Sequence, residues 1–239
     1  MNNSLSVRET FHRHTSIRGI KQSESKSLSQ DQIDQISESS EYKLNRTFDV
    51  LLGLLAVIPF AILFPIITIA IKISSKGPVL FKQKRTGKNG VEFYCLKFRT
   101  MHLVELKSVQ GKPIVTKKGD KRIFKFGQIL RKTNLDELPQ ILNVLKGEMS
   151  LVGPRPYPVE ECRHWNNTFD DFFYRYLVKP GITGHAQVTG YRGGTLDEDH
   201  MRRRLDKDLI YVQKQSLLLD VKIIYLTVKQ MITFNTNAH

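Results

Sequence analysis

The chain is poor in cysteine: only Cys95 and Cys162 occur among its 239 residues, and they do not form a CxxC pair. This scarcity excludes a disulfide framework and a cysteine zinc site, and it fits a reducing compartment. The sequence also lacks a convincing Walker loop, a GxGxxG pattern and metal-ligand spacing among its histidines. Because no apolar core follows the first charges, the N-terminus does not have the pattern of a signal peptide.

Acidic residues are also scarce, since 23 Asp and Glu stand against 37 Lys and Arg and give a net charge of +14. Such an excess predicts an anionic partner, which nucleic acid, phospholipid headgroups or phosphorylated small molecules would provide. An apolar segment flanked by Lys and Arg favours the membrane and its phosphates. Aromatic residues are not interleaved with a continuous basic stripe, so we expect no nucleic-acid partner.

Charges are absent from the 22 residues between Val50 and Ile71, a length that just suffices to cross a bilayer. Pro59 and Pro65 lie inside this run, and each removes a backbone donor and disfavours a straight helix. Lys and Arg occur on both sides of the run, and such residues concentrate on the cytoplasmic side of a membrane. We therefore predict a reentrant helix that breaks at the prolines and returns. There are two alternatives: a kinked helix that spans the membrane with one end outside the cell, and a helix buried in the protein core.

Composition divides the chain into four parts. Residues 1–40 contain ten serines and few large apolar residues, which predicts a flexible arm over 1–41. Residues 42–76 form the predicted membrane helix–break–helix. Residues 77–230 are expected to form a compact cytoplasmic domain, and residues 231–239 a C-terminal tail. A partner-docking helix at the end of the arm is the alternative to disorder there.

Within the domain, local patterns predict an α+β fold that is mainly α-helical. Apolar alternation around Lys-Asn-Gly predicts a small β-hairpin over residues 79–98, with positive φ at Asn or Gly. Residues 102–121 are polar and predict a loop. Helices are expected at residues 124–131, from about 134, at 159–178, at 196–213 and after Ser216. The last helix has an apolar stripe that could pack on the core or lie in the lipid interface as an amphipathic helix. Its members are Leu217, Leu218, Val221, Ile224, Tyr225 and Val228.

Asp136 and Glu137 are the first candidates for chemistry. Asn134 is expected to cap a helix, with Glu137 at the third position of a capping box. Acids in a first turn complement the helix dipole and need no other purpose. However, a helix N-terminus also attracts phosphate, and Arg131 and Lys132 lie just upstream, where they would neutralise an approaching anion. A carboxylate in this setting suits nucleophilic attack on phosphorus or Mg²⁺ binding.

Four further cations are candidate phosphate ligands. Arg155 lies between two prolines that fix its backbone, so it could hold a diphosphate with both arms of its guanidinium. The alternative is a solvated arginine or an ion pair with Glu160 or Glu161. Lys97 and Arg99 are two apart on the predicted strand and would share one face, either as a phosphate pair or as an exposed edge. Lys179, before Pro-Gly, is similarly ambiguous.

With these residues in view, the chain resembles the bacterial sugar transferases, and more narrowly the monotopic phosphoglycosyl transferases that act on polyprenyl phosphate. The resemblance runs from about residue 46 to residue 227. Six motifs occur in the family's order: FKQKRTG at 81–87, LKFRTM at 96–101, LDELPQ at 135–140, NVLKGEMSLVGPRP at 143–156, KPGITG at 179–184 and SLLLD at 216–220.

The resemblance implies an enzyme of the bacterial inner membrane whose catalytic domain faces the cytoplasm, with the membrane helix broken at Pro65. It implies that Asp136 is the nucleophile on a nucleotide diphosphosugar, with Glu137 completing the acidic pair and Mg²⁺, with Asp136 as its ligand, assisting at the diphosphate. Arg131 and Arg155 match basic positions near the phosphates. The implied acceptor is polyprenyl phosphate, in particular undecaprenyl phosphate, and the arm could dock polysaccharide-assembly proteins.

The chain departs from the family at three positions. Phe64 precedes Pro65 where the family has serine, Lys179 replaces a common arginine, and His185 replaces a usual tryptophan. The transferred sugar is not encoded in any pattern, although residues 102–121 and 191–195 are candidate specificity segments. A non-catalytic membrane scaffold, which would bind lipid without turnover, is the competing hypothesis.

Overall fold

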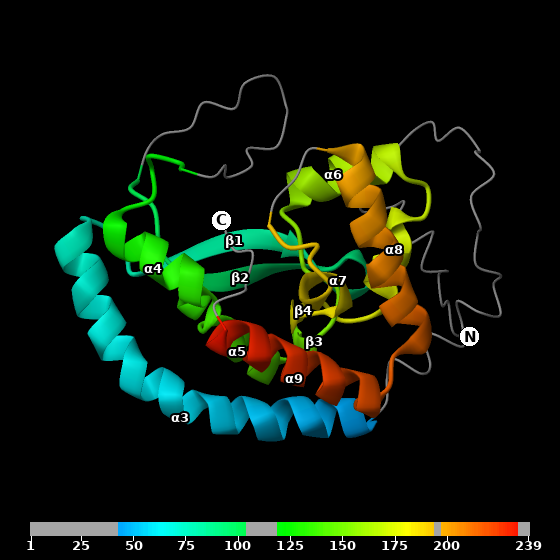
Figure 1. Cartoon of the computed structure of the whole chain (residues 1–239), viewed down its shortest axis with the longest axis horizontal. Helices are drawn as coiled ribbons and strands as arrows, with labels where there is room; N and C mark the ends of the chain where they lie inside the picture. The colour runs from blue at the N-terminus through cyan, green and yellow to red at the C-terminus, as the bar shows by residue number, and fades with distance from the viewer. Residues whose placement is uncertain (1–42, 104–118, 194–196, 234–239) are drawn as a thin grey trace, which may run out of the picture.

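The computed structural model describes residues 43–103, 119–193 and 197–233. The predicted arm at 1–41, most of the predicted loop at 102–121 and most of the tail at 231–239 lie outside these ranges. The described part is mainly helical with two small sheets (Figure 1), which confirms the predicted secondary-structure class. Its helices are α3 (Lys43–Ser74), α4 (Lys125–Thr133), α5 (Gln140–Lys146), α6 (Val159–Thr168), α7 (His185–Val188), α8 (Glu198–Lys214) and α9 (Leu217–Ile232). Its strands and 3₁₀ turns are β1 (Leu80–Thr86), β2 (Glu92–Phe98), β3 (Ser150–Val152), β4 (Gly181–Thr183), η1 (Lys88–Gly90), η2 (Leu135–Glu137) and η3 (Phe172–Leu177).

The predicted β-hairpin is confirmed. Strands β1 and β2 pair antiparallel from Leu80 opposite Phe98 to Thr86 opposite Glu92. The turn between them places Asn89 at φ 55° and Gly90 at φ 76°, in the left-handed region that asparagine and glycine tolerate best. Because strand residues alternate between faces, the pairing fixes the direction of Lys97 near the end of β2.

A second, parallel pair joins β3 to β4, with Ser150 opposite Gly181 and Val152 opposite Thr183. A β-carbon on Gly181 would collide with the backbone nitrogen of Gly153, so only glycine permits this close approach. The amide of Gly153 donates to the carbonyl of Thr183 at 2.9 Å. This pairing therefore fixes the backbone immediately before Arg155.

Helix α3 differs from the predicted helix–break–helix, because it continues through both Pro59 and Pro65 as one helix of 32 residues. It is curved along the side of the domain (Figure 1), as expected where prolines remove intrahelical hydrogen bonds. Its inner face packs Phe60, Ile67 and Ile71 into a core cluster with residues of the domain. We attribute the continuity of the helix to this packing, which holds both sides of each proline against the same surface.

Both ends of α3 are attached to the domain. At the first end, Arg46 donates to the carbonyls of Val144 and Leu145 at 2.6 and 2.7 Å, and an oxygen of Asp49 accepts from the Leu151 amide at 2.9 Å. At the far end, Arg99 donates to the side-chain and main-chain oxygens of Ser75, both at 2.7 Å. The helix thus runs along the domain instead of projecting from it.

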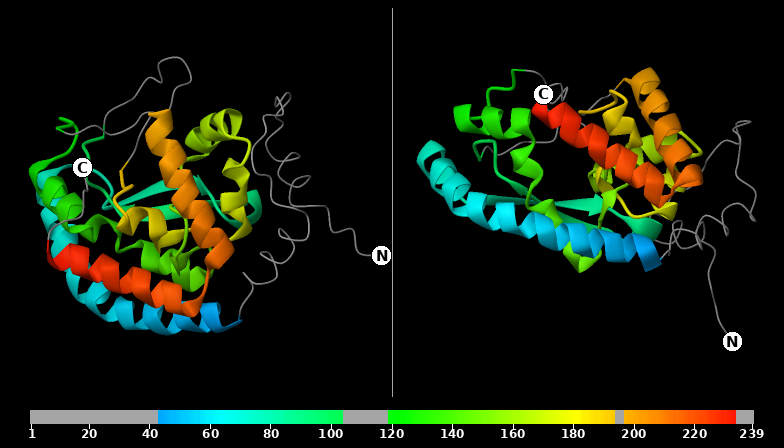
Figure 2. Two further views of the ribbon diagram at one scale, coloured as in Figure 1. Left: turned by 45° about the vertical axis from the view of Figure 1, so that its right-hand side comes forward. Right: turned by 60° about the horizontal axis from the view of Figure 1, so that its bottom comes forward.

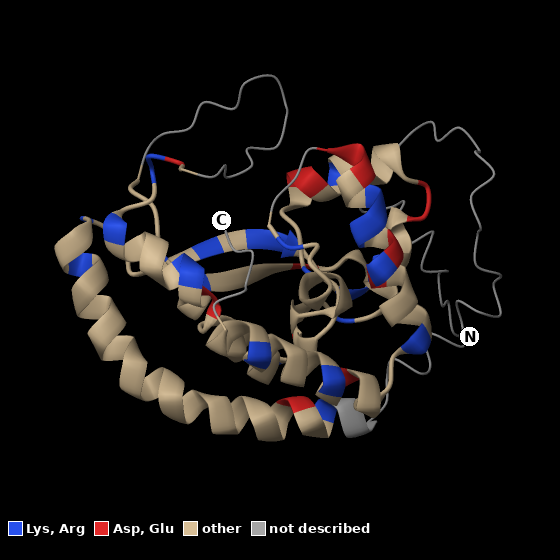
Figure 3. Cartoon of the chain, in the orientation of Figure 1, with Lys and Arg blue, Asp and Glu red and all other residues tan. Residues whose placement is uncertain are grey.

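The outer face of α3 is apolar and exposed. Figure 3 shows that charges occur on this helix only near its two ends. By length and composition, Arg46–Ser74 could cross a membrane. Together with the apolar outer face, this indicates that the chain associates with a membrane. The exposed apolar residues are Leu51, Leu54, Leu55, Ile58, Ile62, Ile66, Ile69 and Ile73.

The C-terminal half forms the rest of the core. The predicted helix over 159–178 is only partly correct, since α6 ends at Thr168 and η3 follows it. Trp165 and Phe172 are fully buried in a cluster with Leu205 of α8. Helix α8 confirms the prediction for 196–213.

Helix α9 begins as predicted, because the Ser216 hydroxyl accepts from the Leu219 amide. Its buried residues are Asp220 and Ile223, whereas Leu218 and Tyr225 on the predicted stripe are 84% and 64% exposed. Of the stripe, Ile224 packs against a core cluster, and the other five members are exposed. Figures 1 and 2 show α9 and α3 along the same side of the molecule, and both pack against β3.

Candidate active site

The acidic pair lies in the short η2 turn between α4 and α5. Asn134 adopts a left-handed conformation with φ 60°, and its amide donates to the Arg131 carbonyl at 3.1 Å, which ends α4. The predicted capping box is therefore wrong: in this conformation Asn134 is the C-cap of the preceding helix, and its side chain makes no capping hydrogen bond. Glu137 is consequently free of a capping role and turns toward the hairpin.

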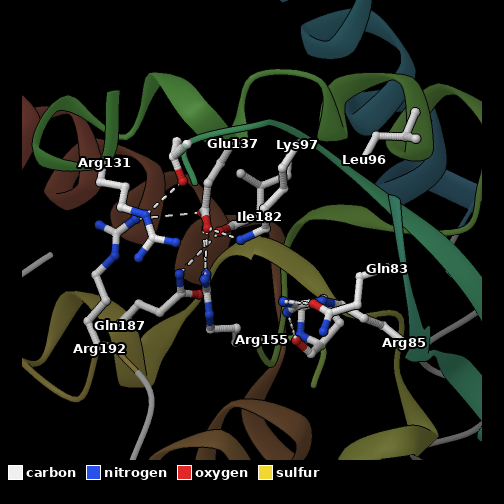
Figure 4. A network of polar contacts seen from close by, with 12 residues as sticks. Gln83, Arg85, Leu96, Lys97, Arg131, Glu137, Arg155, Ile182, Gln187 and Arg192 are labelled. Carbon is white, nitrogen blue, oxygen red and sulfur yellow. Dashed lines mark hydrogen bonds and ion pairs between the residues drawn. The ribbon is translucent and has the colours of Figure 1, made fainter. Parts of the chain in front are cut away.

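Glu137 is buried and forms ion pairs with three cations of the described chain (Figure 4). Its Oε1 lies 2.6 Å from Nζ of Lys97 and 2.7 Å from Nη2 of Arg155. Its Oε2 lies 3.3 Å from Nη1 of Arg155 and 3.7 Å from Nη2 of Arg192. Arg155 is thus held by Glu137, and the alternative pairing with Glu160 or Glu161 is not what the structure shows.

The two neighbouring carboxyl groups differ in acidity. Burial raises the pKa of Asp136 to about 6, and the negative charge of Glu137 adds to this effect, while Lys97, Arg131 and Arg155 oppose it. Burial would also raise the pKa of Glu137, but Arg155 and Lys97 lower it well below its usual range. Glu137 is therefore already ionised in mild acid, whereas Asp136 loses its proton only near its pKa of about 6. Such a separation is typical of paired catalytic carboxyl groups with different roles.

Arg131 completes the cationic surroundings of the pair. Its Nε donates to the hydroxyl of Thr100 at 2.9 Å, which fixes the side chain. Burial lowers the pKa of Arg131, and the negative charges of Asp136, Asp120 and Glu137 oppose this effect. Among the described residues, four positive charges therefore surround the two carboxyl groups of the acidic pair, and this excess of positive charge attracts an anion. The four belong to Lys97, Arg131, Arg155 and Arg192.

Arg99 and Lys179, predicted as phosphate ligands, have other partners. Strand β2 ends at Phe98, so the alternation that would place Arg99 on the same face as Lys97 no longer applies. Arg99 holds the end of α3 through Ser75, as described above. Lys179 lies near Arg46 and Asp49: burial and the charge of Arg46 lower its pKa, and Asp49 opposes this effect. The structure therefore assembles Lys97, Arg131 and Arg155 with the acidic pair and leaves these two cations elsewhere.

Arg192 is the residue that sequence reasoning missed. It follows α7, in a turn between Gly190 and Gly193, and reaches Glu137 only through the tertiary fold. The two glycines indicate a turn, but no local pattern shows which way the arginine points. The sequence therefore predicted only that residues 191–195 are a candidate specificity segment, and it did not indicate that Arg192 contacts Glu137.

In the described part of the chain, no group of three or more His, Cys, Asp and Glu side chains is arranged to hold a metal ion. Mg²⁺ does not require such a cage, because it is commonly bound by one or two carboxylates together with substrate phosphates and water. Both oxygens of Glu137 are engaged by cations. Asp136 is therefore the carboxylate whose chemistry fits a Mg²⁺ that arrives with a diphosphate.

Comparison with known proteins defines the class. Residues 40–234 match the model of the bacterial sugar transferase family, and the chain belongs to this family. A UDP-glucose:undecaprenyl-phosphate glucose-1-phosphate transferase of Xanthomonas campestris is 45% identical over 177 residues, which are 73% of this chain and 36% of that protein. A protein of the same name from Caulobacter vibrioides is 43% identical over 79% of this chain and 69% of its own length. An exopolysaccharide production protein of Rhizobium leguminosarum is 41% identical over 80% of this chain and 96% of its own length. The chain thus spans little more than a third of the Xanthomonas relative but nearly all of the one from Rhizobium.

Proposed function

We propose that this chain transfers a sugar 1-phosphate from a UDP-sugar to undecaprenyl phosphate, and so initiates synthesis of a surface polysaccharide such as an exopolysaccharide or capsule. The names of the Xanthomonas and Caulobacter relatives support this substrate class, and the name of the Rhizobium relative supports exopolysaccharide production. The observation that carries the proposal is a partly exposed Asp136 beside a cation-bound Glu137, with four cations around the pair. An ionised carboxylate in such surroundings can approach a diphosphate without net repulsion.

In the first step of the proposed mechanism, a carboxylate oxygen of Asp136 attacks the phosphorus that bears the sugar. The bond from this phosphorus to the bridging oxygen breaks, and UMP leaves with the electron pair. An acyl phosphate now links the sugar phosphate to Asp136. The excess positive charge stabilises the charge that develops on the leaving phosphate, which is the main catalytic requirement of phosphoryl transfer.

In the second step, an oxygen of undecaprenyl phosphate attacks the same phosphorus. The acyl phosphate bond breaks, the carboxylate of Asp136 is regenerated, and the lipid diphosphate sugar forms. Both substrates are anions, and a covalent intermediate lets one cationic site serve them in turn. Glu137 does not react in this scheme: it holds Lys97 and Arg155 in place between the two steps.

Mg²⁺ is part of the proposal, with Asp136 and the phosphate oxygens of the substrate as its ligands; when bound it would neutralise charge on the diphosphate. Arg131 and Arg155, fixed by Thr100 and Glu137, orient the phosphates.

For the membrane we propose that the curved α3 enters the inner membrane with its apolar outer face and keeps both of its ends, together with the domain, on the cytoplasmic face. Support comes from its exposed apolar outer face and from the attachment of both its ends to one domain. A helix that crossed the bilayer with one end outside would have to give up one of these attachments. The exposed stripe of α9, on the same side of the molecule, would lie at the lipid interface.

Cysteine labelling tests this topology. Single cysteines replace Ser6, which lies before α3, and Val91, which lies after it. The native Cys95 and Cys162 are both buried, so we expect them not to react with the label. We expect that a membrane-impermeant maleimide added to intact spheroplasts labels neither position, and that it labels both after lysis. Labelling of only one position in intact spheroplasts would establish a true span and contradict the reentrant course.

A screen of the purified full-length chain tests the reaction. UDP-glucose, UDP-galactose, their N-acetylamino counterparts and GDP-mannose are each incubated with undecaprenyl phosphate and Mg²⁺. We expect at least one UDP-sugar to give UMP and an equal amount of lipid-linked sugar. Lipid binding without monophosphate release from any donor would contradict the proposal and favour the scaffold hypothesis.

A further inference from the structure

The three cations on Glu137 are not equivalent. Lys97 and Arg155 contact its Oε1 at 2.6 and 2.7 Å, and Arg155 reaches Oε2 with its second nitrogen at 3.3 Å. Arg192 lies 3.7 Å from Oε2, beyond hydrogen-bond distance. The charge of Glu137 is therefore already compensated by two close cations. The contact of Arg192 therefore stabilises the charge of Glu137 least of the three, and breaking it costs the least free energy.

The backbone around Arg192 has room to shift. Gly190 and Gly193 on either side of it have φ values of 97° and 89°, which other residues rarely adopt. A β-carbon added at either glycine would meet no atom within 4 Å. The turn is attached to α7 through the amide of Tyr191, which donates to the Ala186 carbonyl at 2.9 Å. Arg192 thus follows a residue that is hydrogen-bonded to α7, and it lies between two glycines with open space around their α-carbons.

The side chain of Arg192 is nevertheless directed into the site. It is only 12% exposed, and Figure 4 shows it converging with Lys97, Arg131 and Arg155 on Glu137 from a separate element. An arginine that shares an already neutralised carboxylate gains more from a diphosphate, which carries more charge and accepts both arms of the guanidinium. Arrival of such an anion would give Arg192 a better partner within its reach.

We propose that Arg192 is a substrate-phosphate ligand that leaves Glu137 for the diphosphate of the nucleotide sugar, while Lys97 and Arg155 remain on Glu137. This inference rests on the proposed function, because it takes a UDP-sugar as the ligand. It adds to the reaction scheme a cation that moves with the substrate, whereas Arg131 and Arg155 are held by the protein.

UDP is the probe for this proposal, since it carries the diphosphate of every UDP-sugar without the unidentified sugar. Its affinity for the full-length chain is measured by calorimetry in lipid nanodiscs for Arg192→Ala, Arg192→Lys and the control Arg203→Ala. Arg203 is exposed on α8 and donates only to the carbonyl of Asp199 in its own helix, among its described contacts. We expect Arg192→Ala to weaken UDP binding at least about tenfold, and the control to leave it unchanged.

Two further measurements separate substrate binding from a structural role. Arg192→Lys should recover part of the affinity, because it keeps the charge and loses the paired donors. The thermal unfolding temperature without UDP should be the same for all variants. Equal UDP affinity of Arg192→Ala and the unaltered chain, or an equal loss in the Arg203 control, would overturn the proposal. If the unaltered chain did not bind UDP, the proposed function would fail, and this inference with it.

Discussion

Asparagine in place of Asp136 is expected to abolish UMP release, with a loss of roughly four orders of magnitude or more, as found when a covalent nucleophile is removed. The amide has nearly the same shape as the carboxylate but lacks the charge and the nucleophilic oxygen. Neither half of the proposed reaction can proceed without it. The measurement is the initial rate of UMP release from the UDP-sugar that the unaltered chain uses.

Asp199→Asn is the matched control, because Asp199 is exposed in the first turn of α8, on a separate element. It should retain full activity. Mass spectrometry of the unaltered enzyme, quenched with UDP-sugar in the absence of lipid, should show the mass of a sugar phosphate on the peptide that contains Asp136. Normal turnover by the Asp136→Asn variant, or an adduct on another peptide, would remove Asp136 as the nucleophile.

The pH profile provides an independent check on the same carboxyl group. Burial and the charge of Glu137 raise the pKa of Asp136 to about 6. Only the ionised form attacks phosphorus, so the rate of adduct formation should be maximal above this value and fall tenfold per pH unit below it. Glu137, whose pKa is lowered, stays ionised throughout this range and should not contribute to the profile.

Local patterns were sufficient to predict the elements of this chain that depend on local interactions. The hairpin, with its left-handed Asn89 and Gly90, follows from β-forming residues around a turn signal. The start of α9 follows from the hydroxyl of Ser216, which needs only the next three residues to act as a cap. The cations around Asp136 were also partly predictable, because Arg131 is near in sequence and Arg155 lies between two prolines that fix its backbone.

The features that could not be predicted depend on tertiary contacts. Asparagine is a preferred N-cap residue, but α4 extends to Thr133, so that Asn134 is its C-cap and adopts a left-handed conformation. Pro59 and Pro65 predicted a break, yet the surface of the domain supports α3 on both sides of each proline. Arg192 belongs to the site only because α7 and its turn fold back toward Glu137. In each case a partner distant in sequence decides the outcome.

Methionine in place of Arg155 is expected to lower both stability and activity strongly. It removes the cation that contacts both oxygens of Glu137 and leaves a buried carboxylate with Lys97 and the more distant Arg192. Removing one partner of a buried ion pair costs about 3–5 kcal/mol when the other charge is left uncompensated, and because Lys97 stays 2.6 Å from Glu137 the loss should lie at or below the lower end of this range. Arg155 would also be lost from the phosphate site, so UMP release should fall by about 10²-fold or more. Urea unfolding of the detergent-solubilised chain and UMP release measure the two effects, and Arg163→Met, on the exposed face of α6, is the control.

The stability loss should depend on pH in a defined direction. Arg155 lowers the pKa of Glu137 below its ordinary value of 4.5, so the pair stabilises the fold above that value and loses this contribution as the pH falls through the lower, folded-state pKa. The difference in unfolding free energy between the unaltered chain and Arg155→Met should therefore be largest near neutral pH and shrink in acid.

A second substitution separates the two roles of Arg155. Adding Glu137→Gln to Arg155→Met removes the carboxylate that Arg155 contacts, so the double variant should lose less stability at neutral pH than the two single variants together. It should not recover activity, since the phosphate ligand is still missing. If the double variant were less stable by the sum of the two single losses, Glu137 and Arg155 would not interact as the structure describes. If activity returned with stability, Arg155 would serve only to hold Glu137, and the phosphates would depend on Arg131 and Arg192 instead.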